Sequence, residues 1–198
     1  MKPSIRFAGP DDASILWRFI MDLAIYEKEP DAVKVTPERL ADQMRQERPP
    51  FEALVIEEGD TPIGFALFFH TYSTWTGYPG IHLEDLYVMP EKRGQGAGKA
   101  LLAFIAKLAV ERGCKRFEWA VLNWNEPAIR FYESLGAKPQ EQWTVYRLAG
   151  DALEKVARDA WRLLLDAFAA ACQVRPAVRE RFRGLNLPAP VRRGENSS

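Results

Sequence analysis

The stretch that decides the fold is Leu86-Tyr87-Val88-Met89-Pro90-Glu91-Lys92-Arg93-Gly94-Gln95-Gly96-Ala97-Gly98-Lys99. The apolar run that leads into it, Ile81 to Val88, is typical of a strand, and Pro90 ends that run. Beyond the glycines, apolar residues recur at helical spacing, at Leu101, Phe104, Ile105 and Leu108. The sequence therefore predicts a strand, a glycine-rich turn and a helix, an arrangement that presents backbone N–H groups and a helix N-terminus to an anion.

Two nucleotide-binding loops are excluded by spacing. A Walker loop needs four residues between its first glycine and Gly-Lys, followed by Ser or Thr, whereas three residues separate Gly94 from Gly98 and Ala100 follows Lys99. A dinucleotide fingerprint needs a third glycine where Lys99 stands, and it opens a first βαβ unit. What remains is a phosphate loop of another kind, with Arg93 and Lys99 adding positive charge, or a plain surface turn.

The segment Arg93 to Gly98 resembles the acyl-CoA pyrophosphate loop of the GCN5-related N-acetyltransferases (GNAT), whose pattern is Arg/Gln-x-x-Gly-x-Gly/Ala. The match covers every fixed position. The resemblance implies acetyl-CoA as cosubstrate, held by the strand end and the loop through Leu86, Tyr87, Val88, Arg93, Gly94, Gln95, Gly96, Ala97, Gly98 and Lys99.

Composition excludes several classes of protein. The chain has 198 residues, 47% of them hydrophobic, which is enough for a packed core. Its 27 basic and 27 acidic residues cancel, so we expect no nucleic acid or membrane partner. Cys114 and Cys172 lack metal or redox spacing, so no metal is expected. No signal peptide or membrane span is apparent, which favours a cytoplasmic location.

Patterning along the chain predicts an α/β fold, a mixed central sheet with helices on both faces. The expected order is β-α-α-β-β-β-α-β-α-β, with strands at residues 4–8, 51–57, 63–72, 81–88, 116–122 and 144–148. Helices are expected at 11–26, 36–48, 96–112 and 128–135. We expect an acetyltransferase domain over residues 1–157 and an extension over 158–198, with helix continuing to Cys172 and an arginine-rich mobile tail.

A second motif carries the chemistry of the leaving group. Asn125 and Tyr132 are seven residues apart, which places them on one helix face two turns apart, with Asn125 as N-cap. The run Trp124 to Tyr132 resembles the last helix of polyamine acetyltransferases. In that family the matching asparagine holds the pantetheine arm, here with Pro127 and Ala128 beside it, and the matching tyrosine is the general acid. The alternative for Tyr132 is a packing aromatic.

A tyrosine suits that role because a thiol has a pKa of about 8.5 and a phenol about 10, so the phenol is protonated at neutral pH. The acceptor must be a neutral amine, and stripping a proton from an alkylammonium at pH 7 costs about 4–5 kcal/mol. Glu84 and Asp85 lie next to each other in a strand, so only one of them is expected to face the cleft. The family resemblance selects Glu84, which would anchor the cation and pass its proton through water.

The resemblance, which covers about residues 3 to 157, is to diamine (spermidine/spermine-type) N-acetyltransferases. It implies direct acetyl transfer to a polyamine or diamine in a ternary complex, and a homodimer. Its substrate positions correspond to Tyr26, Glu27, Glu84, Glu118, Trp119, Ala120 and Glu141. Glu118 departs from the histidine of the vertebrate enzymes. Two alternatives stay open: an enzyme of the same fold acting on thialysine, another amino acid or a protein lysine, and a non-catalytic acyl-CoA-binding module.

Overall fold

The computed structural model describes residues 3–160. The chain divides into two compact units, Met1–Ala137 and Lys138–Ser198, which are treated separately. Among the described residues, all strands belong to the first unit. The boundary expected near residue 157 stays a prediction.

The first unit is built on a five-stranded mixed sheet. Its strands follow sequence order and are β1 (Ser4–Phe7), β2 (Glu52–Glu58), β3 (Thr61–Ser73), β4 (Tyr78–Val88) and β5 (Phe117–Trp119). The first four are antiparallel neighbours, and β5 pairs with β4 in parallel. The predicted mixed sheet is confirmed, although β5 is shorter than the expected strand over 116–122.

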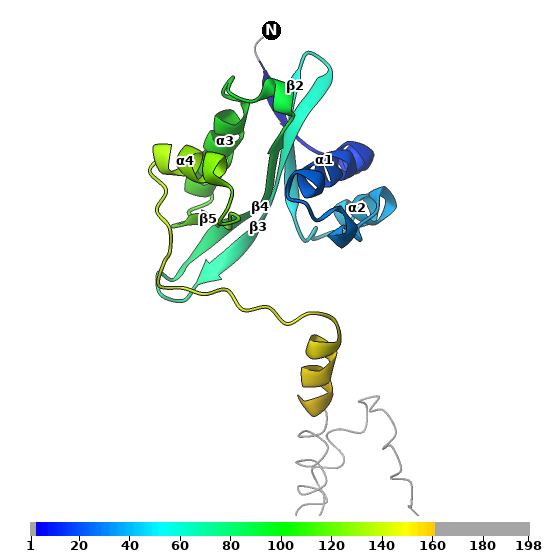
Figure 1. Cartoon of the computed structure of the whole chain (residues 1–198), viewed down its shortest axis with the longest axis vertical. Helices are drawn as coiled ribbons and strands as arrows, with labels where there is room; N and C mark the ends of the chain where they lie inside the picture. Colours follow the sequence, from blue (N-terminus) through cyan, green and yellow to red (C-terminus); the bar gives the residue numbers. More distant parts are fainter. Residues whose placement is uncertain (1–2, 161–198) are drawn as a thin grey trace, which may run out of the picture. The chain divides into compact units, whose positions relative to one another are not determined.

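Helices cover both faces of this sheet, as predicted. Figure 1 shows α1 (Ala13–Tyr26) and α2 (Pro37–Met44) on one face, and α3 (Ala97–Glu111) and α4 (Glu126–Ser134) on the other. Short 3₁₀ turns at Pro10–Asp12, Pro30–Ala32 and Pro90–Lys92 lie in the connections. The N-cap expected for α2 is present, since Thr36 Oγ1 accepts a hydrogen bond from the Arg39 amide at 3.2 Å.

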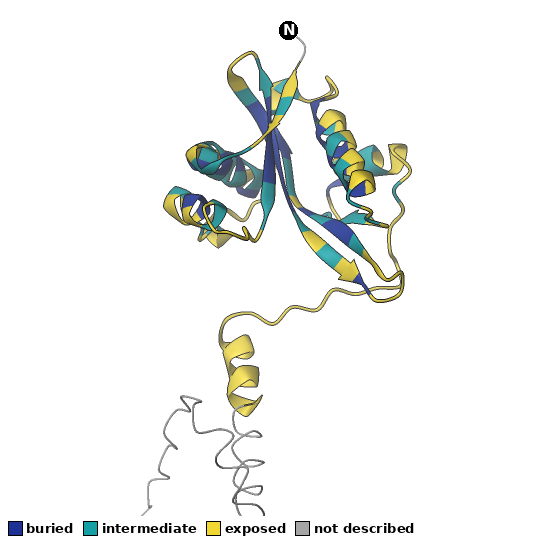
Figure 2. Ribbon diagram, turned by 180° about the vertical axis from the view of Figure 1, so that it is seen from behind, coloured by how far each residue is buried: buried dark blue, intermediate teal, exposed yellow. Residues whose placement is uncertain are grey.

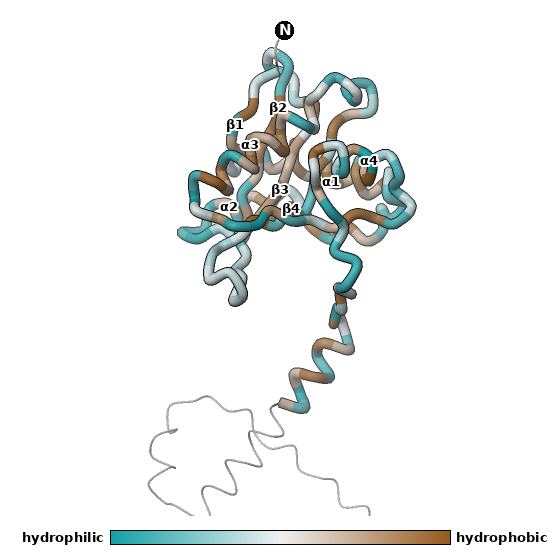
Figure 3. The backbone as a smooth tube through the Cα atoms, turned by 90° about the vertical axis from the view of Figure 1, so that its left-hand side faces the viewer, coloured by the Kyte–Doolittle hydropathy of each residue, from teal (hydrophilic) through white to brown (hydrophobic). Residues whose placement is uncertain are grey.

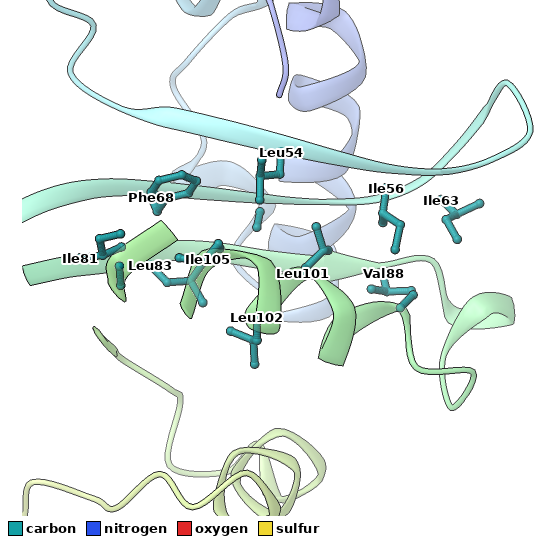
Figure 4. Close-up of a cluster of buried hydrophobic side chains, with 13 residues drawn as sticks. Leu54, Ile56, Ile63, Phe68, Ile81, Leu83, Val88, Leu101, Leu102 and Ile105 are labelled. Atoms are coloured by element: carbon teal, nitrogen blue, oxygen red, sulfur yellow. The ribbon is translucent and has the colours of Figure 1, made fainter. Parts of the chain in front are cut away.

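Each face of the sheet has its own hydrophobic core. Phe68 and Ile81 pack against Leu101 and Ile105 of α3 (Figure 4). On the opposite face Phe65 packs against α1. The ring of Phe19 in α1 stacks on the ring of Phe65, with centroids 5.8 Å apart. The middle strands are accordingly dark blue in Figure 2, and residues 53–56 of β2 are hydrophobic, as the colours of Figure 3 indicate. Alternate residues of one strand therefore serve two cores.

A β-bulge interrupts this alternation in β4. Leu67 of β3 pairs with Asp85 and the next residue, Phe68, pairs with Leu83, so Glu84 has no partner in the ladder. Leu83 belongs to the core under α3; beyond the bulge Leu86 and Val88 pack there too. The side-chain phase of β4 thus shifts by one residue at Glu84. The sequence predicted a regular strand, in which side chains alternate between the two faces without such a shift.

In the second unit, the strand expected at Thr144–Leu148 does not form. Val145 and Tyr146 are 85% and 92% exposed. Although this segment has residues that favour strands, a strand needs a neighbouring strand to bond its backbone, and propensity alone does not provide one. Residues 150–160 are helical, in agreement with the predicted extension helix. Its continuation to Cys172 and the arginine-rich end lie outside the described residues.

Candidate active site

A cavity of about 610 Å³ opens where β4 and β5 separate. The two strands pair only from Ile81 to Leu83 of β4, so residues 84–88 have an open edge on that side. All but three of the predicted site residues line this cavity: Tyr26, Glu27, Glu84, Leu86, Tyr87, Val88, Arg93, Gly94, Gly96, Ala97, Gly98, Lys99, Trp119, Ala120, Asn125, Pro127, Ala128 and Tyr132. Four separate stretches of sequence therefore meet in one hollow of the first unit.

The three other predicted residues lie elsewhere. Gln95 Nε2 donates to the Glu91 carbonyl at 3.1 Å, within the loop itself. Glu118 forms an ion pair with Arg116, whose Nε lies 3.3 Å from its Oε1. Glu141 belongs to the second unit, so its role as a substrate residue stays a prediction.

Sequence reasoning missed several cavity residues, most of them apolar: Leu23, Leu83, Lys92, Val121, Leu122, Phe131, Ser134 and Leu135. Some could have been found. Leu23 precedes Tyr26 by three residues, and Phe131 and Leu135 follow Ala128 by three and seven, so each lies on the helix face of a predicted site residue. Val121 and Leu122 follow the end of β5 and gave no such signal.

The glycine loop has the geometry that a phosphate requires. Gly94 and Gly96 have φ values of +73° and +88°, which side chains rarely adopt, and Gly96 is the N-cap of α3. A Cβ built on either glycine would meet no atom within 4 Å. The space beside their backbone is therefore open, and a ligand anion can approach the N–H groups at the start of α3.

The cations of the loop have different roles. Arg93 Nε donates to the Val88 carbonyl at 2.9 Å, and its guanidinium lies over the Tyr26 and Tyr87 rings, 4.9 and 5.5 Å from their centroids. Lys92 Nζ lies 2.5 Å from Glu58 Oε2. Within residues 3–160, Lys99 has no ion-pair partner and it lines the cavity. Lys99 is thus the cation most available to a phosphate, while Arg93 holds the strand end in place.

The open edge of β4 directs backbone groups into the cavity. The Met89 amide donates to the Ile63 carbonyl at 3.0 Å, toward β3. Because successive residues of a strand direct their N–H and C=O groups to opposite sides, those of Leu86 and Val88 point to the open edge. The bond from Arg93 to the Val88 carbonyl agrees with this direction. The cavity wall therefore includes N–H donors that can polarise a carbonyl.

Asn125 connects the start of α4 with the end of α1. It is the N-cap of α4, as predicted: its Oδ1 accepts from the Ala128 amide at 3.4 Å. The same oxygen accepts from the Tyr26 hydroxyl at 3.0 Å. Asn125 is also buried, with only 9% of its surface exposed. Its carboxamide oxygen is therefore held by Tyr26 of α1 and by the first turn of α4.

Tyr132 is partly buried among aromatic rings. Its ring centroid lies 5.0 Å from that of Trp119 and 5.4 Å from that of Phe131. Burial, and then the charge of Glu27, raise the pKa of Tyr132 above its usual value. In the part of the chain that the structure describes, its hydroxyl has no hydrogen-bond partner. The phenol is therefore protonated at neutral pH and can donate into the cavity.

Three carboxylates, Glu27, Glu84 and Asp85, lie close enough to affect one another, and two of them, Glu27 and Glu84, line the cavity. Burial raises the pKa of Asp85 to about 7, with further contributions from the charges of Glu84 and Glu27. Burial also raises the pKa of Glu27, which is the C-cap of α1. Glu84 is 56% exposed and lies 3.8 Å from His82 Nε2. This concentration of negative charge suits a cationic ligand.

Other kinds of site find no support between residues 3 and 160. No group of three or more metal-ligating side chains occurs there. The helices of that part of the chain are also too short or too polar to cross a bilayer.

Known proteins resemble this chain in sequence and in fold. Residues 17–137 match the model of the acetyltransferase (GNAT) family. Thialysine N-epsilon-acetyltransferase of Sus scrofa is 40% identical over 164 residues, which cover 77% of this chain and 96% of that protein. Spermidine/spermine N(1)-acetyltransferase-like protein 1 of Homo sapiens is 31% identical, over 75% of this chain and 23% of that one. An integron cassette protein of V. cholerae has a TM-score of 0.67 and 25% identity, covering 79% of this chain and 98% of its own. The chain therefore belongs to the GNAT family and is an acetyl-CoA-dependent N-acetyltransferase.

Proposed function

We propose that this enzyme transfers acetyl from acetyl-CoA to the terminal primary amine of a small diamine or polyamine. The observation that supports this most is that one cavity is lined both by a phosphate-type glycine loop and by carboxylates. The glycine loop and Lys99 are suited to phosphate, whereas Glu27 and Glu84, with Asp85 near them, are suited to an ammonium group. The thioester would lie between them, beside the open edge of β4.

The cofactor end would bind acetyl-CoA mainly through the backbone. The amides of residues 94–98 and the N-terminus of α3 would hold the pyrophosphate, with Lys99 adding charge. Asn125 would orient the pantetheine arm beside α4, and an N–H group of Leu86 or Val88 would polarise the thioester carbonyl.

At the acceptor end, the carboxylates would bind the ammonium and receive its proton. Glu84 is the exposed member of the acidic group and lines the cavity, so it is the residue that we assign to proton transfer through water. Once neutral, the amine would attack the thioester carbonyl directly in a ternary complex. As the C–S bond breaks, Tyr132 would donate its proton to the sulfur.

A thialysine-type amino acid is the second candidate acceptor. It is favoured by the 40% identity to an enzyme named for thialysine, over nearly the whole length of that protein. Such an acceptor also ends in a primary amine, so the roles of Glu84 and Tyr132 would be the same. The two candidates differ at the far end, where a diamine has a second cation and an amino acid has a zwitterion.

An amine panel tests the proposal. Acetyl-CoA consumption would be measured with putrescine, spermidine, spermine, thialysine and lysine, with the product identified by mass. A higher kcat/KM for the diamines supports the first candidate, and a higher value for thialysine supports the second. Binding of acetyl-CoA without turnover of any amine would contradict both. Assembly as a homodimer and a cytoplasmic location also remain predictions, and sedimentation of the full chain tests the first of them.

A further inference from the structure

His82 lies beside Glu84, which lines the cavity, and it has no role in the mechanism above. It precedes Glu84 by two residues in β4, and its Nε2 is 3.8 Å from Glu84 Oε2. This distance is beyond a hydrogen bond, but a rotation of the exposed Glu84 side chain would close it. The His82 side chain is 27% exposed, so it has contact with solvent as well as with the carboxylate.

The ring of His82 is held from the neighbouring strand. It lies against Phe69 of β3, its register partner, with centroids 5.1 Å apart and planes at 31°. On the other side its register partner in β5 is Glu118. The ring therefore has a fixed position between two strands, and Glu84, at the bulge, has the freedom to move toward it.

The charged groups around this ring are mostly acids. Glu84 and Asp85 belong to its own strand, and Glu27 at the end of α1 acts on Asp85. From β5 come Glu118 and Arg116, which pair with each other at 3.3 Å. An imidazolium formed at His82 would thus have carboxylates beside it.

We propose that His82 is a positioning residue that orients Glu84 and takes from it the proton that the acceptor ammonium loses. The inference rests on the proposed function. The alkylammonium gives its proton through water to the Glu84 carboxylate, which passes it to the neutral imidazole, and the imidazolium releases it to solvent. The resulting amine attacks the thioester carbonyl, the C–S bond breaks and the thiolate takes the Tyr132 proton. The second N–H proton, lost as the amide forms, restores the Tyr132 hydroxyl. Each turnover therefore releases one proton.

Histidine suits this step because imidazole changes its charge between about pH 5 and 8, whereas a carboxylate near pKa 4.3 accepts a proton from ammonium poorly. A second proton acceptor next to Glu84 would empty it after each transfer. The advantage should be largest at neutral pH and should vanish near pH 10, where the amine itself is neutral.

The pH profile of His82→Gln tests this. Glutamine keeps a hydrogen-bond donor for Glu84 but cannot accept the proton. We expect kcat/KM for the best amine to fall about tenfold or more at pH 7, with the gap closing as the pH approaches 10. Exogenous imidazole should restore part of the rate of His82→Ala at pH 7. In a Glu84→Gln background, the His82→Gln change should have little further effect, because the two residues act in series.

His70→Gln is the matched control. His70 also lies 3.8 Å from a glutamate, since its Nδ1 approaches Glu52 Oε1, but Glu52, unlike Glu84, does not line this cavity. Its kcat/KM profile should follow that of the wild type. A His82→Gln variant that loses the same factor at every pH, or loses nothing, overturns the inference while wild-type turnover keeps the proposed function. A wild type that acetylates no amine overturns both.

Discussion

The two ends of the cavity are built in different ways. The proposed pyrophosphate site of the cofactor end is one continuous segment, Arg93 to Lys99, which would bind mainly through backbone amides. The proposed acceptor end would combine the end of α1, the bulge of β4 and the edge beside β5. A site that binds through backbone amides can be recognised from one continuous stretch of sequence. A site that binds through side chains from several elements depends on how the strands pair. Variants at the two ends should therefore fail in different measurements.

Tyr132→Phe should have the largest effect, because it removes the proton donor for the departing thiolate. The phenylalanine keeps the contacts with Trp119 and Phe131 and removes only the hydroxyl. General acid catalysis is worth about 10²–10⁴-fold, or about 3–5 kcal/mol of barrier. We expect that loss in kcat, measured with the best amine of the panel, and almost none in acetyl-CoA affinity measured by calorimetry.

If Tyr132 only packs between the aromatic rings, the same variant would lose a little stability and turn over within a few-fold of wild type. That result would remove Tyr132 as the acid and leave water to protonate the thiolate. The two interpretations differ by at least about tenfold in kcat, which steady-state kinetics resolves easily.

The accuracy of the predictions made from the sequence differs between the two ends in the same way. The strand, loop and helix around Arg93 were predicted closely because glycines and helical spacing are local signals. The N-cap at Asn125 was also predicted, and its hydrogen bond joins residues only three apart. The bulge at Glu84 was not, since it is a property of the pairing between β3 and β4. Nor was the contact between Tyr26 and Asn125, whose positions are 99 residues apart in the chain.

Asp85→Asn tests the acceptor end through the stability of the protein. The pKa of Asp85 is about 7 in the folded chain, against a usual 3.8. Between these values the folded state binds more protons than the unfolded state, so this group makes the protein less stable as the pH rises. Asparagine cannot ionise, so the variant should match wild type near pH 4 and exceed it above pH 7 by about 2–4 kcal/mol in the free energy of unfolding.

Urea unfolding at pH 5 and pH 8 measures this difference, and Asp12→Asn serves as a control of opposite sign. The Arg6 guanidinium, at 2.7 Å, lowers the pKa of Asp12, so that carboxylate stabilises the fold above the usual pKa and loses its effect in acid. Asp12→Asn should therefore be less stable than wild type at pH 8, with a smaller gap as the pH falls. An Asp85→Asn variant whose advantage does not grow with pH would show that the carboxyl is not a buried, proton-binding group.

Gly96→Ala should have the smallest functional effect of these variants, a selective loss at the cofactor end. An alanine at φ +88° costs about 1–2 kcal/mol, because its Cβ is strained in the left-handed region. No atom lies within 4 Å of that Cβ, so the fold should accommodate it. In the complex, however, the methyl group would occupy the space that a pyrophosphate oxygen needs. Loss of one charge-assisted hydrogen bond, about 1.5 kcal/mol, should weaken acetyl-CoA binding about tenfold in calorimetry.

Gly77→Ala separates the strain from the binding. Gly77 lies in the turn between β3 and β4, has a φ of +70°, and also has no atom within 4 Å of a built Cβ. Its alanine variant should lose a similar free energy of unfolding, yet it should bind acetyl-CoA as wild type does, since the turn is not part of the cavity. If both variants weaken binding equally, strain alone explains the loss. If neither does, the pyrophosphate does not bind at Gly96, and the assignment of the loop to the cofactor end is wrong.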